Sequence, residues 1–589
     1  SSADMLSKQL GSKVEIGSVN LGFLNRVVVN DLTLYEPNGK KMASIARVSA
    51  SINPIALMSG RVDIGTAQLF GTKATLYKDT PDSPPNYQFI IDAFAQEEKE
   101  EPTPLDVHIG SLIMRHTDVT YDVKSVPFQQ GTFNPQHLKL HDLGMNVVLR
   151  CLTDDSLNMD VRRLQARELN SGLTLRDTRL KLIGNKQHVT LLDVDASMPH
   201  SQIAVDSLYL TYGQWESEKK FSFRTTAISG HITPRDLSPF HEKLSSLNQT
   251  LNFSVTAAGD EQEIQVKECN ISTEEEGLLL RTTGVLSHPL DKQQRDVQAT
   301  ISTLRIHHDE LLTWVDALVP AHQQEALLDA IQDIEYNGTI HYLANGELIS
   351  QGNVSTGVGR ATYDLTYDQE HFLTGTITGD SINIGKLHDE QFGTTSFDLD
   401  VALNLEHTNP LPVGKVNGTI HNIYYNGYNY QNINLDARTT SSQVSGTASI
   451  DDENVKADVD FAYTDHPLKG IDMNVLLEHI NPNNLNLTKE HIGESLSLNT
   501  DIHLQGTDFK HLYGTALMDD INLTTPDETY HLNSIMLNAE KQENGESLYT
   551  IKSDILSGNI QGETALPDIA QRFIRQMSRH LPIIFKPQS

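Results

Sequence analysis

Apolar and polar residues alternate with a period of two through most of the chain. In the stretch SFDLDVALNL, Phe397, Leu399, Val401 and Leu403 occupy odd positions, and mainly acidic or amide residues lie between them. A half-buried strand requires this pattern, because successive side chains point to opposite faces of a sheet. Leu496, Leu498 and Ile502 follow the same rule in SLSLNTDIHL. One apolar and one acidic face predict a mainly β fold, an antiparallel sheet with solvent on one side.

A phrase with glycine in fourth position recurs at 14–21 (VEIGSVNL), 62–69 (VDIGTAQL) and 107–114 (VHIGSLIM). In each copy the apolar positions change between even and odd numbers across the glycine. We interpret each as a strand in which a β-bulge at glycine returns the apolar residues to one face and curves the sheet. The alternative is a turn at the glycine that joins two short strands. The apolar face would then carry Val14, Ile16, Val19, Leu21, Val62, Ile64, Leu69, Val107, Ile109, Leu112 and Met114.

Helical periodicity is confined to four stretches. These are 54–60, 86–96, 311–335, which reads as two helices parted by Pro320, and the arginine-bearing 567–581. So little helix cannot cover a long sheet, so the apolar face must fold over on itself, pack on another sheet or hold something else apolar.

A second phrase, with isoleucine followed by leucine five residues later, begins at residues 232, 306, 382 and 480. Its spacing predicts a solenoid-like sheet that was extended by duplication of units of several strands. We therefore divide the chain into an N-terminal β unit with short helices (1–96), an acidic linker (97–104), a repetitive β-groove (105–310), a helical insertion (311–335), a continuation of the groove (336–566) and a C-terminal amphipathic helix (567–589).

Charge and cysteine content narrow the function classes. Lys and Arg total 45 against 77 Asp and Glu, a net charge of -32, which disfavours binding to nucleic acid or to an anionic membrane face. No apolar run is long enough for a membrane-spanning helix, and no signal peptide precedes the first strand, as expected of a fragment of a longer protein. Cys151 continues an apolar row, which favours an unpaired buried thiol over a bond to Cys269.

Catalytic and metal-binding patterns are weak. The tetrad His307 to Glu310 holds ligand-type residues, but neighbouring residues at a helix start point in different directions, which favours a solvated first turn over a metal site. Asp398 and Asp400 are better explained as one exposed strand face than as an acid/base pair. We expect no enzyme activity and no cofactor. The basic 567–581 helix either meets lipid head groups or, as we favour, caps the end of the groove.

Residues 8–79 resemble the start of the periplasmic part of bacterial AsmA-like proteins, in particular the TamB type of translocation and assembly module. The resemblance rests on patterns of apolar residues and glycine, at Leu10, Gly11, Val14, Gly17, Leu32, Leu34, Gly39, Pro54, Leu57, Gly60, Val62, Ile64, Leu69 and Leu76. The inner-membrane helix and the C-terminal domain of that family, which contacts an outer-membrane barrel of the TamA type, have no counterpart in this sequence.

The resemblance implies a taco-shaped antiparallel sheet, a β-taco, whose apolar groove carries phospholipid or other acyl chains. It also implies the periplasm of a Gram-negative bacterium, an inner-membrane anchor in the full-length protein and a barrel partner. The groove would be lined by the apolar residues named for the three glycine phrases and by Phe397, Leu399, Val401, Leu403, Leu496, Leu498 and Ile502. Two alternatives stay open: an assembly factor that templates outer-membrane protein or autotransporter folding by β-augmentation, and a packed β-sandwich array.

Overall fold

The computed structural model covers the 589-residue chain and divides it into two units. Unit 1 comprises Ser1–Arg295 with Asp309–His322, and unit 2 comprises Asp296–His308 with Gln323–Ser589. The structure describes residues 2–58, 61–95, 106–152, 156–185, 187–212, 221–319, 325–387, 390–406, 412–489, 493–508, 511–563, 565, 568, 569 and 572.

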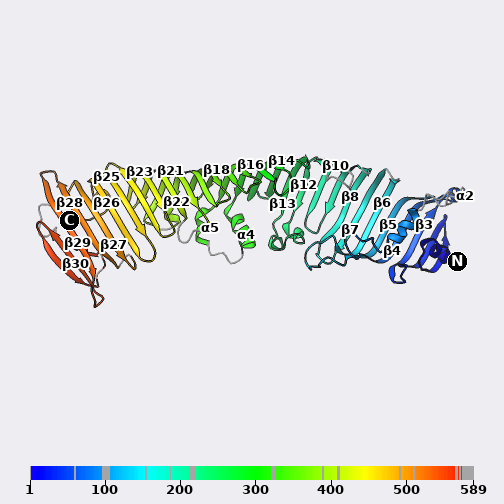
Figure 1. Cartoon of the computed structure of the whole chain (residues 1–589). Coiled ribbons are helices and arrows are strands. Elements are labelled where there is room, and N and C mark those ends of the chain that lie inside the picture. The colour runs from blue at the N-terminus through cyan, green and yellow to red at the C-terminus, as the bar shows by residue number, and fades with distance from the viewer. Residues whose placement is uncertain are drawn as a thin grey trace. The chain divides into compact units, whose positions relative to one another are not determined.

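Both units are mainly β, as the period-two pattern predicts (Figure 1). The strands of unit 1 are β1 (Val14–Gly22), β2 (Arg26–Tyr35), β3 (Lys41–Ile52), β4 (Arg61–Lys78), β5 (Asp106–Val123), β6 (His137–Leu152), β7 (Leu157–Glu168), β8 (Thr174–Gly184), β9 (His188–Ser197), β10 (Gln202–Tyr212), β11 (Phe221–Thr225), β12 (Ile228–Ile232), β13 (Leu251–Asp260), β14 (Glu263–Thr273) and β15 (Leu278–Ser287).

Unit 2 continues with sixteen strands. They are β16 (Asp296–Ile306), β17 (Ile334–Tyr342), β18 (Leu348–Thr356), β19 (Gly359–Tyr367), β20 (Phe372–Asn383), β21 (Phe392–Asn404), β22 (Val413–Tyr425), β23 (Tyr428–Thr439), β24 (Gln443–Asp451), β25 (Val455–Thr464), β26 (Lys469–Ile480), β27 (Ser495–Gly506), β28 (Leu512–Thr524), β29 (Thr529–Lys541), β30 (Ser547–Ser553) and β31 (Ser557–Gly562).

Within each unit, strands that follow one another in sequence are paired in space, except β11 and β12, which each pair with β10 on one side and with β13 on the other. All described pairs are antiparallel except β4 with β5, which is parallel, and β10 pairs with both β11 and β12. Tight turns make this possible: Asn426 and Gly427, between β22 and β23, both have positive φ, the conformation of a two-residue hairpin turn. The predicted extended antiparallel architecture is therefore confirmed.

Helices are short and few in the described residues: α1 (Ser2–Leu10), α2 (Pro54–Met58), α3 (Gln88–Ala95), α4 (His308–Leu318), α5 (Glu325–Ile331) and the 3-10 helices η1 (Pro234–Leu237), η2 (Glu242–Ser246) and η3 (Ile384–Lys386). Apart from α1, the 3-10 turns and the first three residues of α4, they lie within the stretches of helical periodicity. The linker 97–104 and most of 567–581 fall outside the described residues, and the domain boundaries drawn from the sequence stay predictions. None of the helices in the described part of the chain combines the length and apolar character needed to cross a bilayer.

The second repeated phrase marks the ends of strands. Its isoleucine closes β12, β16 and β26 and is the second residue from the end of β20, and each strand is followed by a helix or a tight turn. Three strands lie between β12 and β16 and between β16 and β20, and five lie between β20 and β26. Because the same phrase breaks the strand each time, it is a structural repeat of the sheet and not a recurring binding motif.

The glycine phrase bends the sheet in two ways. Gly65 and Thr66 of β4 lie opposite Ser51 alone, so the pairing with β3 shifts by one residue, and the β-bulge prediction is confirmed there. At Gly17 it is wrong, because β1 and β2 keep one register through this position. There, Gly17 lies opposite Asp31, whose φ is 55°, and an added Cβ would come within 2.9 Å of the Asp31 Cβ.

This irregularity continues across the neighbouring strands. Gly71 of β4, His116 of β5 and Asp142 of β6 also have positive φ, and with Asp31 they form a line across the sheet. Along this line the apolar residues of each strand change between even and odd numbers. Gly110 lies opposite Gly65, and an added Cβ would be 2.9 Å from the Gly65 carbonyl oxygen. Each phrase lies inside a single strand, so the alternative of a turn is wrong.

A buried histidine fixes the start of β6. Nδ1 of His137 lies 2.8 Å from Oδ1 of Asp122, and Nε2 lies 2.7 Å from the carbonyl oxygen of Val126. Both partners only accept hydrogen bonds, so both ring nitrogens donate and the ring is the imidazolium ion. The hydrogen bond to Asp122 is the main reason that the pKa of His137 lies above its usual value of 6.5.

The raised pKa of His137 predicts a pH-dependent stability of the 124–136 segment. The stabilisation of this segment by protonated His137 is complete below about pH 6.5 and is lost as pH rises through the higher pKa of the folded state. We expect His137→Gln to remove this dependence and to increase protease cleavage of the segment at acidic pH by ~10-fold. Limited proteolysis across pH tests it, with exposed His531→Gln as the control; an unchanged pH profile in His137→Gln would contradict the assignment.

The apolar sheet face as the candidate functional site

Cross-strand pairing assembles the apolar residues of unit 2 into continuous rows. Residues that face each other across antiparallel strands project from the same side of the sheet. The Leu399 row, running from β20 to β29, consists of Ile377, Leu399, Gly418, Leu435, Ala448, Val459, Val475, Thr500, Met518 and Ile535. The Val401 row beside it consists of Val401, Val416, Ala437, Gly446, Phe461, Met473 and Ile502.

A third row includes Phe397 of β21 and ends at Leu498 of β27. Its intervening members are Ile420, Ile433, Ile450, Ala457 and Leu477. We call the side of unit 2 that carries these three rows the apolar face. It brings Phe397, Leu399 and Val401 together with Leu498 and Ile502, although about one hundred residues separate the two groups in sequence.

The apolar face is not covered like a protein core. Leu399, Leu435, Val459 and Val475 are all partly exposed, although their side chains point to the apolar side of central strands, and Val401 is one of the few fully buried members. The accessible surface of the chain is 34765 Å², whereas a compactly folded protein of 65.5 kDa has ~21,000 Å². A second sheet packed on these rows would have buried them almost completely.

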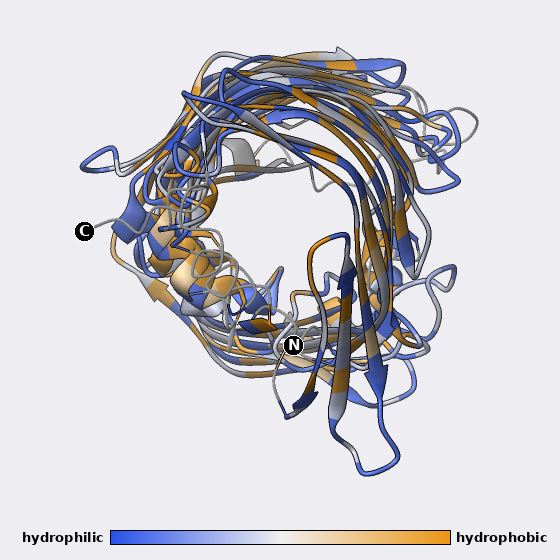
Figure 2. Cartoon of the chain, turned by 90° about the vertical axis from the view of Figure 1, so that its left-hand side faces the viewer, coloured by the Kyte–Doolittle hydropathy of each residue, from blue (hydrophilic) through white to orange (hydrophobic). Residues whose placement is uncertain are grey.

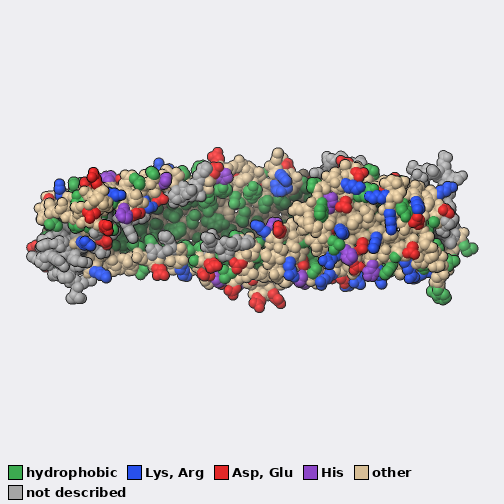
Figure 3. All heavy atoms as spheres, turned by 90° about the horizontal axis from the view of Figure 1, so that it is seen from below, with side chains coloured by type: hydrophobic (Ala, Val, Ile, Leu, Met, Phe, Trp, Pro, Cys, Tyr) green, Lys and Arg blue, Asp and Glu red, His purple; other side chains and the backbone are tan. Residues whose placement is uncertain are grey.

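The strands of unit 2 are strongly curved (Figure 2), and the space-filling view shows hydrophobic side chains gathered in a hollow along this unit (Figure 3). The described helices that lie wholly in unit 2 are α5, with seven residues, and the 3-10 helix η3, with three. Curvature therefore gathers the rows without a helical layer to cover them.

The opposite side of the same strands is acidic. One row alternates aspartate with neutral residues: Asp400, Asn417, Asp436, Thr447, Asp460, Asn474 and Asp501. This spacing keeps like charges from lying directly opposite each other on adjacent strands, where they would repel. A shallow depression of about 830 Å³ lies over this face, and its lining includes Asp436, Thr447, Asp460, Asn474 and Asp501 of this row. We call this side the acidic face.

Histidines balance part of this charge. His421 Nε2 lies 2.7 Å from Asp398 Oδ2, and this hydrogen bond is the main cause that lowers the pKa of Asp398. His503 contacts both Asp472 and Asp501, at 2.7 and 2.8 Å. The aspartates predicted to be solvated thus lie on an exposed strand face, with no arrangement that aligns two carboxyl groups on a common substrate.

In unit 1, rows connect the three glycine phrases. Val19 of β1, Leu69 of β4 and Met114 of β5 belong to one row through Val29 and Val48. Leu21 and Leu112 belong to a neighbouring row through Val27, Ala50 and Ala67, and Ile64 lies opposite Ile109. Val62 and Val107 are opposite each other in the β4–β5 register.

The remaining residues predicted to line the groove differ in exposure according to their position in the sheet. Val14 is buried and Ile16 half-buried, opposite Leu34 and Leu32, while Val19 and Leu21 are exposed because β1 has a partner on one side only among the described strands. Leu403 and Leu496 are half-buried, and both extend rows of the apolar face of unit 2. The structure thus places the predicted residues on shared faces within each unit.

A polar group on the apolar face was missed by the sequence reasoning. The hydroxyls of Tyr336 and Tyr363 are 2.7 Å apart, and Ser350 Oγ lies 2.9 Å from the Tyr363 hydroxyl. Burial, followed by the hydrogen bond to Tyr363, raises the pKa of Tyr336 to about 12, so this phenol is neutral. The Tyr336 side chain covers Gly338 and Gly352. The only sequence signal was that both tyrosines sit at apolar positions of their strands.

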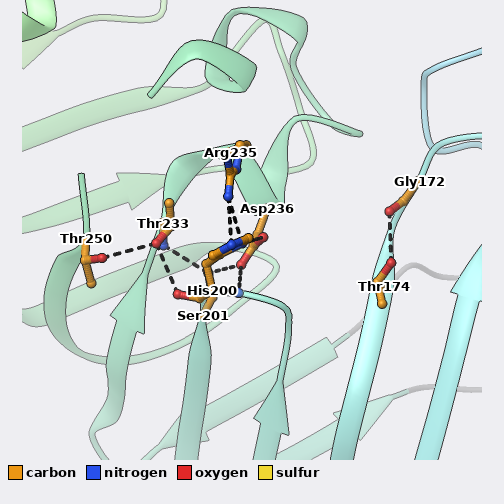
Figure 4. Close-up of polar contacts among 8 residues, drawn as sticks. All are labelled: Gly172, Thr174, His200, Ser201, Thr233, Arg235, Asp236 and Thr250. Atoms are coloured by element: carbon orange, nitrogen blue, oxygen red, sulfur yellow. Dashed lines mark hydrogen bonds and ion pairs between the residues drawn. The ribbon is translucent and has the colours of Figure 1, made fainter. Parts of the chain in front are cut away.

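One cluster in unit 1 contains serine, histidine and aspartate (Figure 4). Ser201 Oγ donates to Asp236 at 2.6 Å and accepts from the Thr233 amide, while His200 contacts Asp236 and Arg235. Burial opposes ionisation of Asp236, but the hydrogen bonds from Ser201 and His200 outweigh it and lower its pKa. A nucleophilic serine needs a hydrogen bond to the histidine, whereas this serine is buried and bonded to the carboxylate. The cluster therefore tethers the turn after β9 to η1.

The other candidate metal-binding and reactive side chains do not converge on one site. His307 and His308 point to different acids, Asp333 and Asp329, each at 3.4 Å. Within the described ranges no three His, Cys, Asp or Glu side chains converge to hold a metal ion. Cys151 and Cys269 are unpaired and half-buried, and burial raises the pKa of the Cys269 thiol.

The extended apolar face is thus the most developed feature of the described residues. Searches against protein-family models, curated proteins and solved structures find no match to this chain.

Proposed function

We propose that this protein is a bridge-like lipid carrier. Its sheet curls into a taco-shaped groove, the acyl chains of phospholipids lie against the apolar face, and lipid moves along the groove without covalent chemistry. In line with the resemblance to AsmA-like proteins, we place it in the periplasm, where it would connect the inner and outer membranes and support the upkeep of the outer membrane.

The observation that carries this proposal is the uncovered state of the apolar rows. Leu399, Val459 and Val475 lie in the middle of a sheet yet remain partly exposed. Apolar surface exposed to water is costly, roughly 25 cal/mol per Å², and a large contiguous patch usually marks a binding surface. An acyl chain would remove that surface from water.

The length of the rows favours movement over storage. From β20 to β29 the Leu399 row crosses nine strand spacings, roughly 43 Å at ~4.8 Å each. A phospholipid acyl chain spans only about 15 Å, half of a bilayer core. The row is interrupted by one polar side chain, Thr500, whose hydroxyl donates to the Leu517 carbonyl. A bound chain therefore meets similar surroundings at each step.

A second candidate function is supported by a different observation. Strand β1 pairs with β2 on one edge only among the described residues, so its other edge is open to an added strand. The protein could then template a client barrel or autotransporter by β-augmentation. This alternative predicts peptide contacts at β1 and no lipid on the apolar face of unit 2.

Site-specific photocrosslinking separates the two. A photoreactive residue at Leu399 or Val459 should capture phospholipid in cells, whereas the same residue at Asp400 or Asp458 on the acidic face should not. Lipid extraction and native mass spectrometry of the purified chain provide the second readout. A chain that purifies free of phospholipid, with only protein captured from Leu399, would overturn the proposal, and protein captured from β1 alone would favour β-augmentation.

A further inference from the structure

The hairpin tip between β1 and β2 exposes large apolar side chains. Leu21, Phe23 and Leu24 are 85, 88 and 78 % exposed. Helix α2 lies beside this tip, because the amide of Ile52 donates to the carbonyl of Asn25 at 3.0 Å and α2 begins two residues later. Ile55 and Met58 of α2 are 79 and 91 % exposed. Two adjacent loops at the N-terminal end of unit 1 thus share one apolar surface, which we call the apolar tip (residues 21–24 with 55 and 58).

Several other described turns of the chain carry no large apolar residue. The turns after β2, β14, β24 and β29 carry EPNG, EEEG, DEN and QENGE. Turns on a soluble protein are normally built from such residues, so the apolar tip departs from the pattern of its own chain.

The backbone conformation at the tip is also unusual for the residues that adopt it. Leu24 has a φ of 60° and Asn25 a φ of 59°, so two of the three residues between the paired Gly22 and Arg26 adopt the left-handed conformation. Glycine, asparagine or aspartate adopt it most readily, and a leucine there is unfavourable. Folding of the hairpin therefore does not account for Leu24, and its nearly complete exposure excludes a packing role within the described residues.

Charge around the tip also differs from the rest of the chain. Residues 1–79 contain nine Lys and Arg against six Asp and Glu, whereas the whole chain has 45 against 77. Residues 16–30 contain one charged side chain before Asp31, the exposed Arg26 at the base of the tip, and residues 48–60 contain none. Hydrophobic side chains project at this end of unit 1, at the right of Figure 3.

From these observations we propose that the apolar tip inserts into the interfacial region of a lipid bilayer. Narrow turns with separately projecting Leu, Phe, Ile and Met side chains suit a fluid hydrocarbon layer, which closes around each side chain, better than a protein partner, which needs a broad complementary surface. Arg26 lies where it would meet lipid phosphate, and the positive balance of residues 1–79 lowers the electrostatic barrier that the acidic remainder imposes. The proposal does not require lipid in the groove of unit 2.

The test uses the whole chain and vesicles of phosphatidylethanolamine with phosphatidylglycerol, and matched vesicles of phosphatidylcholine. The variant L21S/F23S/L24N removes three apolar side chains and places asparagine at a position whose φ suits it, so the hairpin should fold at least as well. The control F128S/L290S removes exposed apolar side chains elsewhere in unit 1. Circular dichroism and thermal unfolding verify that all three proteins fold.

We expect the wild type and the control to sediment with both vesicle types, and the tip variant to partition at least ~30-fold more weakly. In Phe23→Trp, emission should shift to the blue on binding and be quenched by lipids labelled in the shallow acyl region. Absence of vesicle binding by the wild type, or equal binding by the tip variant, overturns the proposal. The proposal is also overturned if the wild type forms an oligomer that the tip variant does not form, because the apolar tip then contacts a second copy of the chain.

Discussion

Leu399→Asp should reduce the phospholipid that co-purifies with the chain by ~10-fold or more, while leaving the protein folded. The carboxylate would lie within the Leu399 row, between Ile377 and Gly418. An acyl chain crossing it would have to desolvate a charge, which is very costly without a partner. Because Leu399 is partly exposed, water can solvate the carboxylate in the empty groove, so we expect a loss of only about 1–2 kcal/mol in the free energy of unfolding.

The matched control is Ala402→Asp on the same strand. Residue 402 points to the acidic face and lies opposite Lys415 of β22, which can balance the added charge. Lipid extraction followed by mass spectrometry, with thermal unfolding in parallel, compares the two variants. If Leu399→Asp unfolds the chain while Ala402→Asp does not, the rows are a packed core and the sandwich alternative holds. If both variants keep their lipid, the lipid lies elsewhere.

Glu168→Ala is expected to produce the largest local loss of stability. The Glu168 carboxylate is buried at the end of β7 and accepts hydrogen bonds from the amides of Lys139, Asn170 and Ser171 and from the Ser171 hydroxyl. Alanine leaves these donors without an acceptor, and each unsatisfied buried group costs about 1–3 kcal/mol. We therefore expect the segment 168–173 and the start of β6 to open, at a total cost of about 3 kcal/mol or more.

Hydrogen exchange measures this effect at the three amides, whose protection should fall by at least ~100-fold. Glu168→Gln keeps one acceptor oxygen and should show a smaller loss, and Glu263→Ala on an exposed strand position should show none. Burial raises the pKa of Glu168, but its hydrogen bonds together lower it below the usual value of 4.5. The stabilisation by the ionised Glu168 carboxylate is therefore complete above about pH 4.5 and is lost as pH falls through its lower pKa in the folded state. Wild-type protection in Glu168→Ala would refute this role.

The Asp236 cluster shows why side-chain identity alone is a poor guide to function in this chain. Ser201, His200 and Asp236 include the residue types of a hydrolase, and nothing in their sequence positions reveals their contacts. Only the folded arrangement shows that the serine bonds to the carboxylate and not to the imidazole. The same holds for Tyr336 and Tyr363, which are 27 residues apart and meet through the pairing of β17, β18 and β19.

The sequence by itself determined the strands and their two faces. The alternation around Leu399 and Asp400 specifies which side chains share a side, because a strand has a side-chain period of two whatever its neighbours are. It also located the sites where the sheet bends, since the change of parity at Gly17 and Gly65 is visible in the residue order. It did not reveal that Gly65 forms a bulge whereas Gly17 lies opposite Asp31 in an unshifted register. That difference depends on whether the apolar residues of the neighbouring strand also change between even and odd numbers at the same point.

Only the tertiary structure decided which rows meet and how far they are covered. Leu399 and Thr500 belong to one row because seven strands, β21 to β27, pair in unbroken order, a consequence of register that no local pattern encodes. Burial is likewise a property of what lies above a face, and the same alternation would suit a sandwich core or an open groove. Leu21 and Leu399 have similar positions in their patterns, yet one is almost fully exposed at an edge strand and the other half-buried in the middle of a curved sheet, because neighbouring strands cover one and not the other.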